Sequence, residues 1–429
     1  MSRRLLWLLV GGCACLAAAC GTDASAAQTR RVLVDYVHDE VASSFLAYFP
    51  SDVTVRPGDT VLFQQEWTGE PHSVTMGTMV DEMMSVVGPL IEEYGDSPEE
   101  PPEDVLATYE EAMAPLPEML DFGASFLQVN QNAGQPCYLD SGAPPEDGDT
   151  PCDDAQQEQP PFDGRQSYYN SGFIPYEGPQ GNEFTVQLAD DIAPGIYSYY
   201  CNLHGPFQSG TITVVDPDEP IPSQDEVARQ ARAEIEEQAA PLLAAFEAAP
   251  REGTAEVFGM TAEPPLAGWT SEEQMVSQTF LNEFIPRDIE VRVGEPVTWT
   301  FVGGHTVSFG VPEYFAQVVV EDDGTVVFSE DASRPVNSPP LPEGSLGPPE
   351  PEGSEAPEEA EGNEGSEEAQ EPPGPPEPVL VDAGEWDGEQ FISSGLAGGI
   401  LYRLRFTKPG TYPYACLIHP QMVGTVEVR

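Results

Sequence analysis

Short runs in which hydrophobic and polar residues alternate are spread along the chain and predict β-strands. One such run covers residues 31–36, and residues 49–63 hold two more, separated by the turn-forming pair Pro57-Gly58. The second half of the chain repeats this pattern over residues 285–299. The pattern therefore predicts a mainly β protein.

The segments that close the two halves also correspond. Residues 193–204 read APGIYSYYCNLH, and residues 408–419 read KPGTYPYACLIH. Further back, Asn170-Ser-Gly-Phe matches Ser393-Ser-Gly-Leu. An internal repeat of this extent is hard to obtain by chance. We therefore predict two homologous β-domains.

Both halves carry an insertion at the same point of the repeat. In the first half it runs from about residue 78 to residue 164, with helical periodicity over residues 80–94 and 102–114. Cys137 and Cys152 follow in a stretch rich in Pro, Gly and Asp. We predict that these two residues form a disulfide.

The second half and the connection before it show three further patterns. Residues 318–328 predict a hairpin that turns at Asp323-Gly324. Residues 338–378 are almost wholly Pro, Glu, Gly, Ser and Ala, which cannot bury enough apolar surface to offset the entropy of ordering, so this tract is predicted to be disordered. Residues 224–248 predict a helix with one broad apolar face, which we expect to pack on a domain.

The end of the chain carries the clearest chemical motif. Cys416, His419 and Met422 lie on one short loop between two predicted strands, and His305 follows the predicted strand 297–301. A thiolate, two imidazoles and a weakly bound thioether suit copper in both its Cu(I) and Cu(II) states. Zinc also binds Cys and His, but the strand–loop–strand context and the nearly apolar neighbours of the loop favour copper.

This spacing, with His three and Met six residues after Cys, resembles the copper loop of the blue copper proteins (cupredoxins), particularly the short-loop, amicyanin-like members. The segment around His305 resembles the one that bears the first His ligand of that family. The resemblance implies plastocyanin/azurin-type domains, each a Greek-key β-sandwich with copper at one end. It covers roughly residues 28–77, 165–215, 280–310 and 385–429, and not the insertions.

The first half offers His72, Cys201 and His204, but no Met follows them. Gln208 stands close to the place of the missing Met. This is similar to the stellacyanin-type replacement of the axial Met by Gln, which implies a lower potential because an amide oxygen stabilises Cu(II). Two alternatives stay open, in which Gln208 points to solvent or Met76 takes its place.

The N-terminus indicates export. Residues 3–10 hold two Arg followed by an apolar run, and residues 16–20 read LAAAC, which resembles a bacterial lipobox. Lipidation of Cys20 would anchor an exported protein to the membrane, whereas cleavage after Ala19 or Ala26 would leave it without a lipid. No later stretch is long and apolar enough to predict a transmembrane helix.

The net charge and the number of His residues limit the classes of function that this chain can have. The formal net charge is −58, from 74 acidic and 16 basic residues, which argues against a nucleic-acid partner and favours a redox partner that is basic where it docks. Of the five His, only His38, predicted to lie on the surface, falls outside the copper pattern. No His-x-His pair occurs, so the additional copper centres of multicopper oxidases and nitrite reductases lack ligands, and an enzyme is not expected.

The sequence thus predicts an export segment and tail (1–27), a first cupredoxin domain (28–215), a helical linker (216–254) and a second cupredoxin domain (255–429). The predicted function is electron transfer outside the cytoplasm by up to two type 1 copper ions. Two alternatives remain, a copper-sequestering surface lipoprotein without a redox partner and a protein with copper only in the second domain.

Overall fold

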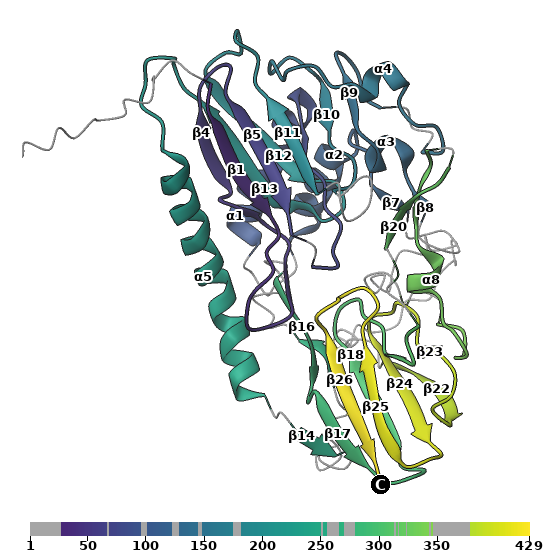
Figure 1. Ribbon diagram of the computed structural model, residues 1–429. Coiled ribbons are helices and arrows are strands. Elements are labelled where there is room, and N and C mark those ends of the chain that lie inside the picture. The colour runs from purple at the N-terminus through teal and green to yellow at the C-terminus, as the bar shows by residue number, and fades with distance from the viewer. Residues whose placement is uncertain are drawn as a thin grey trace, which may run out of the picture.

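The structure is a computed structural model, shown in Figure 1. The described residues are 27–66, 68–95, 101–121, 128–144, 148–174, 182–249, 252–254, 266–269, 279–312, 315, 317–322, 324–342, 345 and 378–429. The predicted export segment with Cys20 and most of the predicted disordered tract lie outside these residues.

The N-terminal sandwich consists of two sheets. One sheet has the order β11 (Glu183–Gln187), β5 (Thr60–Gln65), β1 (Thr29–Val34), β3 (Tyr48–Phe49). The other has the order β4 (Asp52–Val55), β13 (Gly205–Val214), β12 (Gly195–Cys201), β6 (Thr75–Met76), β10 (Tyr168–Asn170), β9 (Cys137–Leu139).

The C-terminal sandwich also consists of two sheets. One has the order β14 (Glu252–Thr254), β17 (Asp288–Val291), β26 (Val423–Val428), β25 (Gly410–Ala415), β19 (Ser308–Phe309), β23 (Ile392–Ser393). The other has the order β2 (Ser43–Phe45), β16 (Thr279–Ile285), β15 (Leu266–Trp269), β18 (Pro296–Phe301), β24 (Ile400–Phe406), β22 (Val379–Trp386).

The two sandwiches share their strand pairings. The series β4-β13-β12-β6-β10 of the first matches β17-β26-β25-β19-β23 of the second. Each also contains the same parallel pairs, β1 with β5 and β4 with β13 in the first, β15 with β18 and β17 with β26 in the second. The prediction of a mainly β chain with two Greek-key sandwiches is confirmed.

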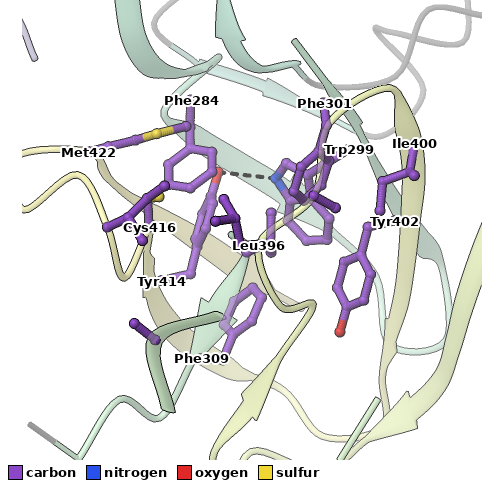
Figure 2. Packing of buried hydrophobic residues seen from close by; sticks show 14 of the residues in the cluster. Phe284, Trp299, Phe301, Phe309, Leu396, Ile400, Tyr402, Tyr414, Cys416 and Met422 are labelled. Carbon is purple, nitrogen blue, oxygen red and sulfur yellow. Dashed lines mark hydrogen bonds between the residues drawn. The ribbon is translucent and has the colours of Figure 1, made fainter. Parts of the chain in front are cut away.

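Hydrophobic and polar residues alternate along the strands, so that every second side chain lies in the core. Along β24 every second residue, from Ile400 to Phe406, is buried. In the C-terminal sandwich Trp299, Phe309 and Tyr414 meet at centroid distances of 5.1–5.9 Å (Figure 2). Each large apolar side chain stabilises the fold by roughly 1.5–3 kcal/mol on burial. These rings lie in one apolar cluster with Cys416 and Met422.

The first insertion is mainly helical. The two predicted helices are confirmed as α1 (Thr78–Tyr94) and α2 (Glu103–Met113). α1 buries Val80, Met83 and Val87, a spacing that places all three on one face. Short elements complete the insertion: β7 (Leu120–Asp121), β8 (Gln128–Val129), α3 (Gln131–Gly134) and α4 (Asp154–Gln157). Cys137 and Cys152 form a disulfide.

The second insertion begins with the predicted hairpin, which is confirmed as β20 (Val318–Val320) paired with β21 (Val326–Phe328). The short helix α8 (Glu330–Ser333) follows. The tract predicted to be disordered from residue 338 starts with placed residues. Ser338 Oγ lies 2.8 Å from Tyr402 Oη, and Leu341 packs against the core. The ordered part therefore extends further than composition suggests, because these first residues find buried partners.

Three contacts join the sandwiches. β2, which belongs to the first half of the chain, pairs with β16 at the edge of a C-terminal sheet. The predicted helix is confirmed as α5 (Gln224–Ala248), and its buried face, which includes Leu242, packs on residues of both halves (Figure 1). Gln131 in the first insertion exchanges two hydrogen bonds with the backbone of Val326, both at 2.9 Å. The two sandwiches are therefore held together at several places.

Among the described helices, none combines the length and the apolar character needed to cross a membrane.

Replacing Cys137 and Cys152 together by Ser should lower the free energy of unfolding by about 3 kcal/mol, because the bond closes a loop of 15 residues in the unfolded chain. Urea unfolding of the metal-free protein measures this. The single variant Cys137→Ser should lose a similar amount, since it breaks the same bond. A double variant as stable as the wild type would contradict the expectation.

Candidate metal centres

Each sandwich brings a His/Cys/His group together at one end. In the first, β12 ends at Cys201, His204 lies in the turn after it, and β13 begins at Gly205. In the second, β25 ends one residue before Cys416, and the loop that holds His419 leads into β26. The strands thus deliver the thiol and one imidazole from a single tight connection.

The remaining imidazole of each group comes from a neighbouring segment. His72 forms an isolated bridge with Ile174, and His305 forms one with Ala397. In each group the candidate ligand atoms lie within 4.8 Å of one another. The structure therefore brings together all six His and Cys residues predicted as copper ligands.

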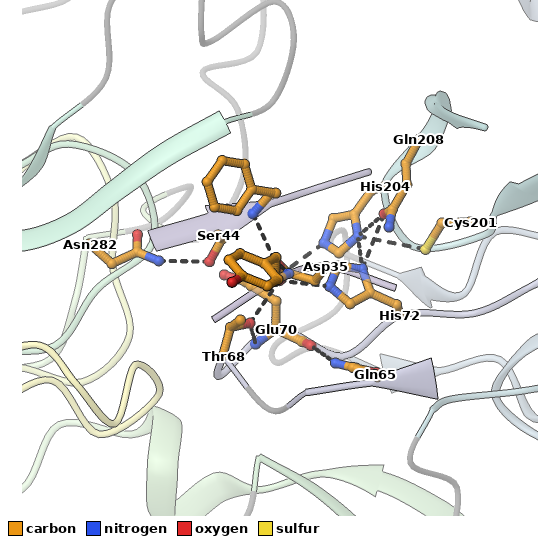
Figure 3. A network of polar contacts seen from close by, with 12 residues as sticks. Asp35, Ser44, Gln65, Thr68, Glu70, His72, Cys201, His204, Gln208 and Asn282 are labelled. Carbon is orange, nitrogen blue, oxygen red and sulfur yellow. Dashed lines mark hydrogen bonds and ion pairs between the residues drawn. The ribbon is translucent and has the colours of Figure 1, made fainter. Parts of the chain in front are cut away.

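In the N-terminal site, His72 Nδ1 and His204 Nδ1 are 3.1 Å apart, and Cys201 Sγ lies 3.6 Å from His204 Nδ1. Gln208 is fully buried and turns inward. Its Oε1 lies 3.1 Å from His72 Nδ1 and 2.9 Å from His204 Nδ1 (Figure 3). The alternative in which Gln208 points to solvent is therefore wrong. Met76 is buried in β6, in the core of the same sandwich.

The C-terminal site repeats these distances. His305 Nδ1 and His419 Nδ1 are 3.1 Å apart, and Cys416 Sγ lies 3.6 Å from His419 Nδ1. Met422 is fully buried, and its backbone bonds to Cys416 and His419 at 3.0 Å each. Figure 2 shows its side chain near Cys416.

The chemistry of these donors fits a cation. His72 Nε2 donates to Asp35 Oδ2 at 3.1 Å, so its Nδ1 presents a lone pair to the cluster. Gln208 adds an acceptor oxygen, while its Nε2 is buried without a partner. Buried lone pairs that face one another are costly unless a positive charge lies among them. The N-terminal site therefore has the electrostatic character of a metal site.

Without a metal, a proton supplies that charge. Burial opposes the charged form of His204 and His419, but the nearby thiolates and Glu70 raise the pKa of each to about 10. Burial likewise opposes ionisation of Cys201 and Cys416, yet the adjacent imidazoles hold both thiol pKa values well below their ordinary value. A bound cation would displace the imidazole proton and keep the thiolate.

The pKa of the imidazole that precedes the Cys in the sequence shifts in opposite directions in the two sites. Burial lowers the pKa of His305. Burial acts in the same direction on His72, but the hydrogen bond to Asp35 reverses the effect and raises its pKa.

A hydroxyl residue that sequence reasoning did not single out aligns each Cys. Ser73 N donates to Cys201 Sγ at 3.4 Å, and Thr306 N donates to Cys416 Sγ at 3.3 Å. The hydroxyl of Thr306 also accepts a hydrogen bond from the backbone N–H of Leu417 at 2.8 Å. The hydroxyl of Ser73 likewise accepts a hydrogen bond from the backbone N–H of Asn202 at 2.8 Å. Both residues directly follow the first His, which is the signal that could have identified them.

Two carboxylates near the rings were also missed. Asp35 is buried against His72, and Glu70 lies next to both His204 and His419. Burial raises the pKa of Glu70, but the nearby imidazoles of His204 and His419 outweigh it and hold that pKa well below its ordinary value. Nothing in the spacing of the sequence indicates which carboxylates approach the rings. The fifth His, His38, is half-buried and lies in neither site.

No protein-family model matches the sequence, and no curated protein has significant sequence similarity to it. The solved structures that are similar to this chain include cupredoxins. An amicyanin variant in its reduced Cu(I) form is 19% identical over 33% of this chain and 70% of its own, with a TM-score of 0.15. The purple cupredoxin of Nitrosopumilus maritimus is 17% identical over 34% of this chain and 83% of its own, with a TM-score of 0.15. The auracyanin of Roseiflexus castenholzii is 19% identical over 44% of this chain and 98% of its own, with a TM-score of 0.20. TM-scores of 0.15–0.20 carry no conclusion about function, which has to be inferred from the site residues of this chain.

Replacing Thr306 by Val should lower the free energy of unfolding of the metal-free protein by about 1–3 kcal/mol, because the buried N–H of Leu417 loses its acceptor. Denaturant unfolding measures the change. Thr306→Ser keeps the hydroxyl and is the matched control. The assignment is wrong if the Val variant is as stable as the wild type or more stable than the Ser variant.

Proposed function

We propose that the chain is a copper protein that transfers single electrons, with one type 1 site in each sandwich. His72, Cys201, His204 and Gln208 would hold one ion, and His305, Cys416, His419 and Met422 the other. The observation that carries the proposal is the pair of buried clusters in which two Nδ1 atoms and one thiol converge. When bound, copper would supply a one-electron couple between Cu(I) and Cu(II).

The surroundings of the ligands support electron transfer over storage. His72, Cys201, His305 and Cys416 are at most 3% exposed, so water has little access to the clusters. The Cys and one His of each cluster are held by a short connection between paired strands. A rigid, dry donor set changes little between two oxidation states, which keeps the cost of electron transfer small.

An enzymatic role is not proposed. In the described part of the chain, the two His/Cys/His clusters are the groups of His, Cys, Asp or Glu that could hold a metal. Outside them, the Nδ1 of His38 accepts a hydrogen bond from the backbone of Glu40 at 3.2 Å. An oxidase or reductase of the multicopper type would need a further group of His.

The sequence supports a proposal about the cellular setting. We propose an exported protein that is anchored by lipid at Cys20 and that exchanges electrons with a partner whose docking face is basic. The lipobox-like segment and the net charge of −58 support this. A surface protein that only sequesters copper would use the same ligands, so reversible cycling at an electrode separates the two functions.

Copper loading tests the proposal. The chain beginning after Cys20 should bind two copper ions and show an intense thiolate-to-copper band. Cys201→Ser and Cys416→Ser should each remove one ion and the band of its own site, because each removes one thiolate. A single ion that is lost only with Cys416 would limit the function to the C-terminal sandwich. A wild type without the band would contradict electron transfer by type 1 copper.

Gln208 and Met422 are the fourth proposed ligands of the two sites, and exchanging them should shift the two redox potentials in opposite directions. Gln208→Met should raise the potential of the N-terminal site, because a thioether favours Cu(I) more than an amide oxygen does. Met422→Gln should lower that of the C-terminal site. A tenfold change in the redox equilibrium corresponds to about 59 mV, and spectroelectrochemical titration resolves it. Potentials that move together, or not at all, would contradict the roles of Gln208 and Met422.

A further inference from the structure

One carboxylate lies between the two candidate metal sites. Glu70 Oε1 accepts a hydrogen bond from His419 Nε2 at 2.9 Å. The other oxygen of the same carboxylate, Oε2, lies 3.8 Å from His204 Nε2. His204 belongs to the N-terminal site and His419 to the C-terminal site, so Glu70 connects the two sites.

The contact uses the ring nitrogens that face away from the clusters. The Nδ1 atoms of His204 and His419 point to their own sites, each 3.1 Å from the Nδ1 of the other imidazole there. Their Nε2 atoms point to Glu70. The path from one site to the other therefore consists of one imidazole, one carboxylate and one imidazole.

The backbone beside Glu70 fits directly against the other sandwich. Gly69 has φ = +112°, and a Cβ at this position would lie 1.9 Å from the carbonyl oxygen of Ile418 and 3.0 Å from His419 Cα. A side chain at residue 69 would therefore collide with the loop that carries His419. This close approach brings the carboxylate within reach of both rings.

Neighbouring polar groups hold Glu70 and tie it to the N-terminal site. The backbone N–H of Glu70 donates to Thr68 Oγ1 at 3.2 Å, and Gln65 Nε2 donates to the backbone carbonyl of Glu70. Thr68 Oγ1 in turn donates to Asp35 Oδ2, the atom that accepts the hydrogen bond from His72 (Figure 3). The position of Glu70 is thus linked to that of the first imidazole.

The repeat shows that a carboxylate is not required here by the fold. Alignment of His72 with His305 places Glu70 opposite Gly303. The C-terminal sandwich forms the same kind of cluster without an acid at this position. Glu70 is therefore a feature of the junction between the sandwiches.

The same junction encloses the C-terminal site. His305 and His419 are each 2% exposed, and Glu70 with its neighbours covers the outer edge of His419. The side chain of His204 is 13% exposed. The route by way of Glu70 therefore leads from the enclosed site to the more accessible ring.

We propose that Glu70 couples the two sites, so that electrons pass between them inside the chain. This inference rests on the proposed function. In each exchange one site is oxidised by one electron as the other is reduced, no bond forms or breaks, and both Nε2 protons stay in place. Glu70 is a positioning residue, since it contacts the imidazoles and does not belong to either donor set.

The test measures exchange between the sites in the copper-loaded protein. After a fast one-electron pulse, the bands of the two sites report how quickly the electron redistributes, and independence from protein concentration identifies exchange within one chain. Glu70→Ala should slow this exchange by about 10-fold or more, by analogy with the 10–100-fold that loss of a group bonded to a metal ligand costs in activity. Glu70→Gln should have a smaller effect, because its amide oxygen can still accept from one ring.

Two controls separate coupling from a structural effect. Glu66→Gln removes an exposed carboxylate of the same segment and should leave the rate unchanged. Rates are compared at saturating copper, with copper content and both bands measured in every variant, so that a slower exchange does not reflect lost metal. In the metal-free protein, the ¹⁵N shifts of His204 Nε2 and His419 Nε2 should both move in Glu70→Gln and stay unchanged in Glu66→Gln.

The outcomes distinguish this inference from the proposed function. Two copper bands, with Glu70→Ala exchanging electrons at the wild-type rate, would overturn the coupling and leave the function standing. A wild type with the C-terminal band alone would overturn the coupling and limit the function to that sandwich, and a wild type with neither band would overturn both. If Glu70→Ala does not fold, Glu70→Gln decides, and unchanged rate and unchanged ¹⁵N shifts in that variant would overturn the coupling.

Discussion

The structure depends on the convergence of lone pairs at the ends of two β-sandwiches. In each site two imidazole Nδ1 atoms lie 3.1 Å apart beside a buried thiol, and in the N-terminal site a buried amide oxygen faces the same point. Such a cluster needs a positive charge. A proton supplies it in the metal-free chain, where the adjacent thiolate and Glu70 raise the pKa of His204 and of His419 to about 10. The surrounding fold keeps the donors together and keeps water away.

Both halves of the chain hold the His and Cys donors together by the same arrangement of strands and connections. A strand ends at or next to the Cys, a tight connection carries the second imidazole, and the next strand leads away along the sheet. The residue after the first His holds the Cys from the other side by a backbone N–H to sulfur bond. Since strands and apolar cores are densely packed, they hold the donors close together without an ion.

The two sites belong to one assembly because the sandwiches are joined at several places. A strand added across the junction, a long helix packed on both halves and a hydrogen-bonded contact between the insertions hold their arrangement. In this arrangement Gly69 fits against the loop of His419, and Glu70 comes between the Nε2 atoms of His204 and His419. The insertions, which the repeat leaves unexplained, thus contribute to the relative placement of the sites.

The sequence by itself determined the strands, the insertion helices, the linker helix, the hairpin and the residues of each His/Cys/His group. These features depend on periodicity and spacing within short segments, and the repeat supplied each pattern twice. The extent of the ordered residues after Ser338 could not be predicted in this way, because their order comes from contacts with Tyr402 and the core. Only the tertiary structure decided that Gln208 faces inward, that Asp35 holds His72, and that Glu70 meets a ring 349 residues further along the chain. The reason is physical: a side chain's partners across a junction depend on how two folded units fit together, and no local pattern of residues encodes that fit.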